Sequence, residues 1–307
     1  MKHQFVEHRF GVESTALIFV IERIMNSYEA QGFKLSLRQL YYQLVAQCLL
    51  PDGWEDPHTG SKNNPKSYAK IGDLVTQGRM AGLLDWDMIE DRTREMIQPP
   101  MWKNPSEIVQ AAAGQFAIDR WKEQNNHVEV MVEKSALEGV LIPVCRELGI
   151  RFTANRGYSS ASTMYEAGQR LRHFVRMGKE VHIIYLGDHD PSGMDMTRDI
   201  RERLSLFSGG DVDTIRVALN FDQVEKLNPP ENPAKLSDSR AAAYIEEFGE
   251  SSWELDAIEP RMLADLVTKR VKKLTDKDQW EVTMATEAQM REDLQAMADD
   301  YETNNSE

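Results

Sequence analysis

From residue 128 to residue 220, short apolar runs alternate with segments whose apolar residues recur at helical spacing. The apolar runs have the length and composition of buried strands, which are predicted at 128–132, 151–155, 181–187 and 214–220. Strands joined by helices in this order form a parallel sheet, and right-handed crossovers bring the carboxyl ends of its strands to one edge. The pattern therefore predicts an α/β domain with a Rossmann-like parallel sheet and a ligand site at that edge.

The first hundred residues have a different, mainly helical pattern. Helical spacing of the apolar residues predicts helices over 15–31, 37–50 and 66–81, with a polar loop rich in Gly, Pro and Asn before the last of them. An apolar stretch follows the third helix, and this combination predicts a small winged-helix-like α(+β) unit. Three prolines within 97–106 indicate a linker, after which a helix over 106–124 is expected to bridge the two domains.

We therefore predict three parts: a winged-helix-like domain over 1–105, the α/β domain over 106–275, and an acidic helix and tail over 276–307. A length of 307 residues fits two ordinary domains. No apolar run reaches the ~18 residues that a membrane span needs. The first ten residues contain no apolar core of a signal peptide. The expectation is a cytoplasmic protein without a membrane partner.

The formal net charge of −14 argues at first against a nucleic-acid partner, since phosphate binding needs lysine and arginine. The acids are concentrated, however, because residues 276–307 hold ten acidic and two basic residues. That segment is expected to be a solvated face, a partner contact or a DNA-mimicking guard. Residues 34–79 hold six basic and four acidic residues, so a local anion site remains compatible with the charge.

Three acidic residues directly follow predicted strands. Glu133 follows the strand at 128–132, and Asp188 and Asp190 follow the strand at 181–187. If these strands are neighbours, the three carboxylates meet at one edge and repel each other unless a cation lies between them. Carboxylate oxygens suit Mg²⁺, and Mn²⁺ is expected to substitute for it. The alternative is that these acids cap helices and fill turns, for which the Asp-Pro-Ser-Gly run is well suited.

A Glu after the first strand, followed by Asp-x-Asp after a later strand, resembles the Toprim domain. Among Toprim proteins, the sequence is most similar to the A subunit of topoisomerase VI and the related meiotic double-strand-break transesterases. The resemblance rests on Val132-Glu133-Lys134, on Asn155-Arg156-Gly157-Tyr158-Ser159-Ser160 and on Gly187-Asp188-His189-Asp190-Pro191-Ser192-Gly193. It covers about residues 127–260. It implies that Glu133, Asp188 and Asp190 hold Mg²⁺, and a late acidic segment, Trp253-Glu254-Leu255-Asp256-Ala257, adds Glu254 and Asp256 as weaker ligands.

The N-terminal unit carries a second part of the resemblance. Leu37-Arg38-Gln39-Leu40-Tyr41-Tyr42 is similar to the tyrosine motif on the family's winged-helix (CAP-like) domain, which implies that Tyr42 attacks DNA. Arg38 lies one helical turn before Tyr42, where it can stabilise a phenolate oxygen. Adjacent tyrosines point to different faces of a helix, so the other tyrosine is expected in the core.

Three basic residues are predicted to contact DNA: Arg79, Lys134 and Arg156. Arg79 lies in Gln77-Gly78-Arg79-Met80-Ala81-Gly82 and is either a phosphate contact or an ordinary surface arginine. The resemblance also implies a homodimer, in which the tyrosine of one chain works with the metal site of the other. Because the chain contains no Walker A loop, topoisomerase action implies a separate ATPase or accessory subunit.

Three functions are compatible with these features. The leading one is Mg²⁺-dependent DNA cleavage by tyrosine transesterification, in a type IIB-like topoisomerase. The second is a Toprim endonuclease of a mobile-element or defence system, which hydrolyses DNA with metal-activated water and no tyrosine intermediate. The third is a non-catalytic DNA-binding scaffold. The sequence departs from the family at His189, at Ser192 and in the loop 51–65, which puts strand passage in doubt more than phosphodiester chemistry.

Overall fold

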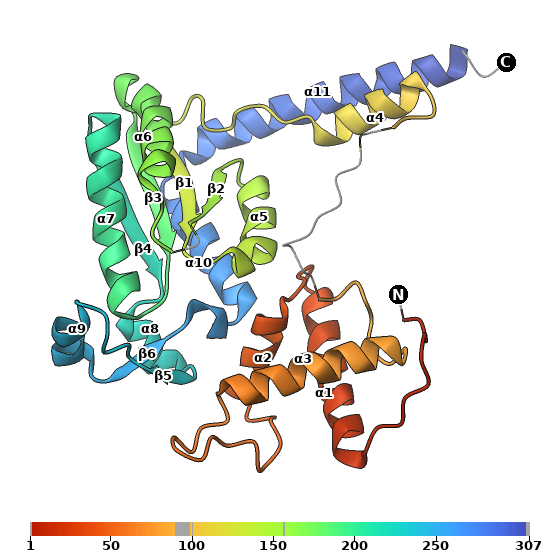
Figure 1. The fold of residues 1–307 in the computed structure, drawn as a ribbon. Coiled ribbons are helices and arrows are strands. Elements are labelled where there is room, and N and C mark those ends of the chain that lie inside the picture. Colours follow the sequence, from red (N-terminus) through yellow and green to blue (C-terminus); the bar gives the residue numbers. More distant parts are fainter. Residues whose placement is uncertain (1, 90–98, 100, 156, 305–307) are drawn as a thin grey trace.

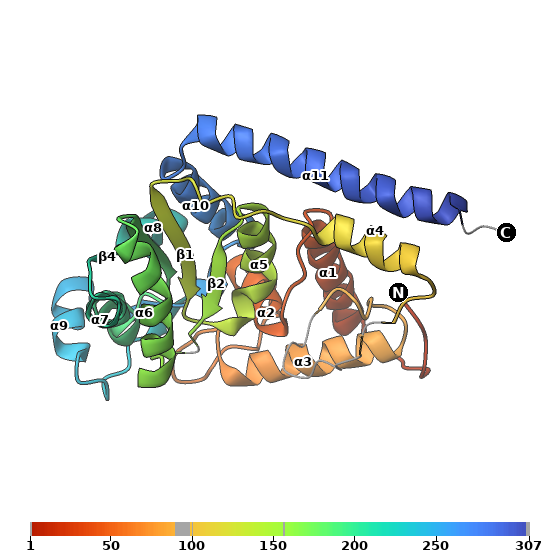
Figure 2. The ribbon, with the colours of Figure 1, turned by 90° about the horizontal axis from the view of Figure 1, so that it is seen from above.

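The computed structural model describes residues 2–89, 99, 101–155 and 157–304. N-terminal helices form one unit, which lies beside a parallel sheet with helices on both faces (Figure 1). Two further helices, α4 (Pro105–Gln115) and α11 (Lys277–Asn304), lie side by side and extend from the sheet unit as an arm (Figures 1 and 2). Among the described residues, no helix combines the length and the apolar character that a membrane crossing requires.

The sheet contains four parallel strands in the order β2-β1-β3-β4. The strands are β1 (Asn126–Val132), β2 (Arg151–Ala154), β3 (Glu180–Leu186) and β4 (Val212–Ala218). Each of the four predicted strands overlaps an observed one. The prediction of a mixed α/β protein with a helix-flanked parallel sheet is confirmed. The finer description, a winged-helix domain joined to a Toprim domain, stays a prediction.

Helices cover both faces of this sheet. After a short 3-10 turn, η1 (Ser135–Leu137), helix α5 (Glu138–Glu147) leads from β1 to β2 and packs on one face together with α10 (Pro260–Lys273). Helices α6 (Ala161–Arg176) and α7 (Pro191–Ser208) pack on the other face. Side chains alternate along β1, so Val130 and Val132 join the first core while Met131 joins the second. Burial of each such side chain contributes roughly 1.5–3 kcal/mol to folding.

One carboxylate is buried on the second face of the sheet. Glu129, in β1, is 1% exposed and accepts hydrogen bonds from Arg170 of α6, with an Nη2–Oε2 distance of 2.8 Å. The His127 imidazole lies 3.1 Å from the other Glu129 oxygen. Burial alone would raise the pKa of Glu129, but His127 and Arg170 lower it to about 2. The pair therefore joins β1 to α6 as a charged contact inside the fold.

The N-terminal unit consists of α1 (Val12–Glu29), α2 (Leu37–Ala46) and α3 (Pro65–Met80), packed around a single apolar core. Helix α2 begins with a capping box, in which the Ser36 hydroxyl accepts from the Gln39 N–H and the Gln39 side chain accepts from the Ser36 N–H. In residues 2–89 the β-structure is limited to two isolated bridges, Gln4–Ala81 and Leu35–Ile89. The wing of a winged helix is therefore not confirmed in the described part of the chain.

The segment after β4 returns to the end of the sheet. It contains α8 (Phe221–Leu227), β5 (Glu231–Pro233), α9 (Ala241–Phe248), β6 (Ser251–Trp253) and the 3-10 turn η2 (Leu255–Ala257). Strands β5 and β6 pair antiparallel. Trp253 also forms a two-hydrogen-bond bridge with His189, in the loop that follows β3. This bridge brings the residues after β6 to the edge where β1 and β3 end.

The arm is fixed to the sheet unit by a buried ion pair. Arg120 donates to both carboxylate oxygens of Glu287, at 3.1 and 2.7 Å, and Glu287 is 1% exposed. At least this acid of the C-terminal segment is therefore not part of a solvated face. The predicted helix over 106–124 is wrong in its second half, because α4 ends at Gln115 and Phe116 is extended. The acidic helix predicted within 276–307 covers Lys277–Asn304.

Candidate functional site

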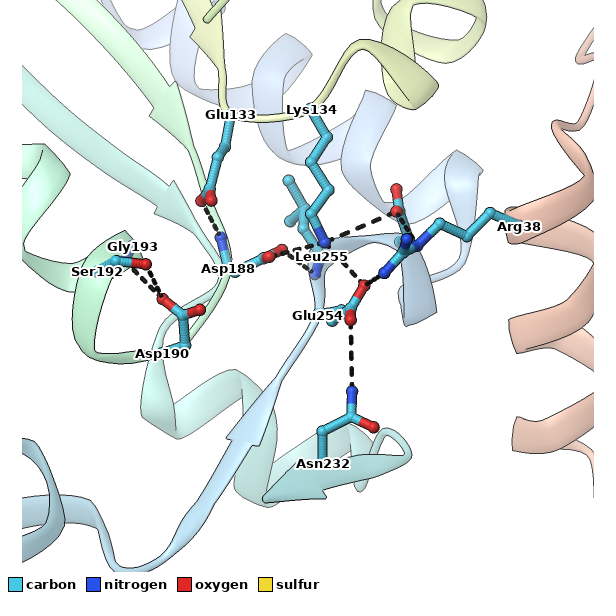
Figure 3. A network of polar contacts seen from close by, with 12 residues as sticks. Arg38, Glu133, Lys134, Asp188, Asp190, Ser192, Gly193, Asn232, Glu254 and Leu255 are labelled. Carbon is cyan, nitrogen blue, oxygen red and sulfur yellow. Dashed lines mark hydrogen bonds and ion pairs between the residues drawn. The ribbon is translucent and has the colours of Figure 1, made fainter. Parts of the chain in front are cut away.

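Glu133 and Asp188 meet at the carboxyl edge of the sheet. They follow β1 and β3, which are neighbouring strands with Val132 opposite Leu186. The Asp188 backbone N–H donates to a Glu133 carboxylate oxygen at 2.9 Å, and both side chains are buried (Figure 3). The parallel sheet thus brings these two predicted site residues together.

Asp190 lies beside this pair and also caps a helix. Its Oδ1 accepts hydrogen bonds from the Gly193 N–H at 2.6 Å and from the Ser192 hydroxyl at 3.0 Å, so it caps α7. The alternative considered for these acids, helix capping, therefore holds for one oxygen of Asp190. A side chain at position 193 would place its Cβ 2.3 Å from the Asp188 carbonyl oxygen, so this turn needs glycine.

Lys134 lies at the centre of the site, between carboxylates from two parts of the chain. Its Nζ is 2.7 Å from Asp188 Oδ2, 2.8 Å from Glu254 Oε2 and 3.8 Å from Asp256 Oδ2. The Leu255 N–H donates to Asp188 Oδ1 at 2.8 Å. The bridge between β6 and the loop after β3 thus places the late acidic segment against Asp188 (Figure 3).

Burial and mutual repulsion change how these acids ionise. Burial and the charge of Asp188 raise the pKa of Glu133 to about 7. Burial also raises the pKa of Asp256, to about 6, against the opposing effect of Lys134. Burial would raise the pKa of Glu254 as well, but Lys134 and Arg38 lower it below its usual value. The site thus contains more acidic groups than its own cations neutralise.

Arg38 brings the N-terminal unit to this cluster. It lies on α2, forms an ion pair with Glu254, and places its Nε 3.2 Å from Asp256 Oδ2. The Arg38 guanidinium carbon is also 5.8 Å from the centre of the Tyr42 ring. Tyr42, Arg38, Glu254 and Asn232 line one cavity of about 270 Å³. The predicted nucleophile therefore faces the late acidic segment of the same chain.

The two adjacent tyrosines differ in their contacts. The Tyr41 hydroxyl donates toward the carbonyl oxygens of Lys62 and Asn64, at 3.1 and 3.2 Å, and accepts from the Asn64 N–H at 2.9 Å. It therefore holds the polar loop against α2. Tyr42 is 5% exposed, and burial followed by the Glu254 charge raises its pKa to about 12, while Arg38 and Asn232 oppose this rise.

The predicted DNA contacts have different environments. The Arg79 guanidinium donates to the carbonyl oxygens of Trp86 and Ile89, each at 2.9 Å, so it stabilises the chain after α3. The Lys134 ammonium is engaged by the carboxylates described above. Arg156 lies outside the described residues.

Two groups at the site were missed by the sequence analysis. Arg216, in β4, is partly buried and donates to the carbonyl oxygens of Gly187, Asp188 and Gly193 at 2.9, 2.5 and 2.9 Å. It thereby shapes the loop that carries Asp188. An arginine inside an otherwise apolar predicted strand was the available signal. The other missed residue is Asn232, which lines the cavity beside Tyr42. No local sequence pattern marked it.

The carboxylate oxygens of the site are of the kind that binds a divalent cation. In this structure they surround the Lys134 ammonium. Neither Asp256 carboxylate oxygen accepts a hydrogen bond from a described residue, and this side chain is 1% exposed. Buried carboxylate oxygens without donors are typical ligands of hard cations. Within the described ranges, no group of three or more His, Cys, Asp or Glu side chains has a metal-binding arrangement in this conformation.

Comparisons of this chain with protein-family models, with curated proteins and with solved structures found no match.

Proposed function

We propose that this protein is a divalent-metal-dependent enzyme that cleaves DNA, with Tyr42 as the attacking group. The observation that carries the proposal is the contact of Arg38 with Glu254 and Asp256, because it joins the tyrosine helix to the carboxylates at the sheet edge. Tyrosine, arginine and a buried carboxylate cluster are the groups that transfer of a phosphodiester to an enzyme requires. The proposed architecture is a winged-helix domain and a Toprim domain.

Each side chain then has a specific role. Glu133, Asp188 and Asp190 would hold Mg²⁺ or Mn²⁺, with Glu254 and Asp256 as further ligands, and the metal would supply positive charge for the scissile phosphate when it is bound. Arg38 orients the phosphate beside Tyr42. The Tyr42 phenol loses its proton and its oxygen forms a bond with phosphorus. The bond from phosphorus to the leaving sugar oxygen breaks, and that oxygen takes up a proton.

Incubation of supercoiled plasmid with the protein and Mg²⁺ or Mn²⁺, followed by denaturation with and without protease, tests the proposal. The expected product is cut DNA that carries covalently attached protein. Tyr42→Phe is expected to abolish the adduct, lowering cleavage by on the order of 10³-fold or more. Tyr165→Phe, on the exposed surface of α6, is the matched control and should leave the adduct unchanged. The absence of any metal-dependent cut would refute the proposal and favour a non-catalytic scaffold.

A second candidate is direct hydrolysis of DNA by water at the same carboxylates. The burial of Tyr42 and its raised pKa favour this reading, because both disfavour a phenolate nucleophile. The plasmid experiment separates the two. Hydrolysis predicts free DNA ends, no adduct, and full cleavage by Tyr42→Phe.

The partners of this activity remain predictions. DNA is the proposed substrate, and the family resemblance implies a homodimer and a separate ATPase or accessory subunit. The resemblance places the tyrosine of one chain at the metal site of another. In this structure Tyr42 instead lines a cavity with Glu254 of its own chain, so we propose that the site is assembled within one chain.

A further inference from the structure

Lys134 occupies the position between carboxylates that a bound cation would take. Its ammonium lies within 2.8 Å of both Asp188 and Glu254, which come from the end of β3 and from the segment after β6 (Figure 3). The lysine is thus a counter-ion held inside the cluster, with its ammonium between carboxylates from two parts of the chain.

The two cations of the site share their carboxylate partners. Lys134 and Arg38 both contact Glu254 Oε2, and both lie near Asp256 Oδ2, at 3.8 and 3.2 Å. Any ligand that draws Glu254 or Asp256 toward itself therefore weakens the hold on both cations. Since Arg38 lies on α2 beside Tyr42, such a change would reach the proposed nucleophile.

The cluster also has capacity for a further positive charge. Five carboxylates gather here, those of Glu133, Asp188, Asp190, Glu254 and Asp256. Among the described residues, Lys134 and Arg38 form ion pairs with them. The charge of Arg216 also acts on Glu133, Asp188 and Asp190, although its hydrogen bonds go to backbone carbonyl oxygens. The buried oxygens of Asp256 accept no hydrogen bond from the described residues. A divalent cation would neutralise more of this charge than one ammonium does.

We propose that Lys134 is the resting occupant of the metal site, and that a divalent cation binds by displacing its ammonium from Asp188 and Glu254. The displacement frees Arg38 from Glu254 and Asp256, so that its guanidinium becomes available to a phosphate beside Tyr42. The identity of the metal site rests on the proposed function. The competition between lysine and metal is new, and it makes metal binding the step that prepares the tyrosine side of the site.

Metal affinity, measured without DNA, tests this competition. Calorimetric titration of Mn²⁺ into the whole protein should show that Lys134→Gln binds at least about tenfold more tightly than wild type, since the competing charge is gone. Lys134→Arg keeps the charge and should stay close to wild type. Lys122→Gln removes an exposed lysine elsewhere and is the matched control. In EDTA, Lys134→Gln should melt at a lower temperature than wild type, and Mn²⁺ should raise its melting temperature more than that of wild type.

Arg38→Gln provides a second variant, which we expect to fold because the Arg38 side chain is 46% exposed. It should also tighten Mn²⁺ binding. In the double variant the two gains should not add, since both cations act through Glu254. Equal or weaker Mn²⁺ binding by both single variants would overturn the inference. So would fully additive gains, because the two cations would then act independently.

The same preparations should be assayed for plasmid cleavage, which separates this inference from the proposed function. Cleavage by wild type together with unchanged metal affinity in Lys134→Gln would refute lysine competition and leave the function standing. Tighter metal binding by Lys134→Gln without cleavage by any preparation would support the competition and refute the function. No Mn²⁺ binding by any preparation would refute both the competition and the metal dependence of the proposed function.

Discussion

Arg38 and Glu254 form an ion pair although they are 216 residues apart in the sequence. The contact joins the helix that carries Tyr42 to the carboxylate cluster at the carboxyl edge of the sheet. Both partners also contact other members of the cluster, because Arg38 reaches Asp256 and Glu254 reaches Lys134. The site therefore depends on how two units of the chain meet, which has consequences that experiments can measure.

Replacement of Glu133 should lower the rate of DNA cleavage and leave the free energy of unfolding almost unchanged. Glu133→Gln keeps the shape of the side chain, and burial with the Asp188 charge already raises the pKa of Glu133 to about 7, so the neutral form is well tolerated. We expect unfolding close to wild type, and metal-dependent plasmid cleavage lower by roughly 10²–10³-fold. Thermal melting and a cleavage time course on the same preparation check this. Cleavage at the wild-type rate would remove Glu133 from the site.

Mixing two inactive variants tests whether the site lies within one chain. Tyr42→Phe and Glu133→Gln each damage one half of the proposed machinery. If Tyr42 works with the carboxylates of its own chain, every mixed assembly lacks a complete site, and mixing should restore no cleavage. Recovery of covalent adduct on mixing would instead show that the tyrosine of one chain acts at the carboxylates of another.

Removal of the Tyr41 hydroxyl should loosen the loop over residues 51–64 without removing the nucleophile. Tyr41→Phe deletes the contacts with Lys62 and Asn64, for which we expect a loss of about 1–2 kcal/mol in unfolding free energy. Urea denaturation and limited proteolysis of the loop measure this effect. Adduct formation should persist at a temperature where the variant is folded. If folded Tyr41→Phe formed no adduct at all, the nucleophile would be Tyr41 and not Tyr42.

The Glu129–Arg170 pair should make stability depend on acid pH. In the folded chain His127 and Arg170 overcome the effect of burial and hold the pKa of Glu129 at about 2, well below its ordinary value of 4.5. The stabilisation is therefore fully present above pH 4.5 and is lost as the pH falls through about 2. A shift of this size corresponds to at most about 3 kcal/mol.

Glu129→Gln should remove that pH dependence. The variant should be less stable than wild type at neutral pH, and the difference should shrink between pH 4.5 and pH 2. Urea unfolding across this range gives the measurement, with the exposed Glu180→Gln as a control at the start of β3. A constant difference at every pH would show that Glu129 acts through packing and not through its charge.

The amino-acid sequence by itself determined the strands, the helices between them and the acids that follow two of the strands. Apolar periodicity is a local property, because it reports which face of an element is buried. Parallel strands joined by helices place their carboxyl ends at one edge, so the sequence placed Glu133 and Asp188 at the same edge. That β1 and β3 are neighbours, which brings the two acids into contact, was shown by the structure. Helix ends were less well predicted, as at Gln115, where α4 ends one residue after Gly114, a glycine that the prediction placed inside the helix.

Only the tertiary structure decided which charges neutralise each other. The bridge between His189 and Trp253 sets the position of Glu254, and the packing of α2 against η2 sets the position of Arg38. Lys134 was predicted to contact DNA, but the fold directs its ammonium to Asp188 and Glu254. Ion pairs across hundreds of residues leave no periodic trace in a sequence, because their geometry arises only when separate elements pack together.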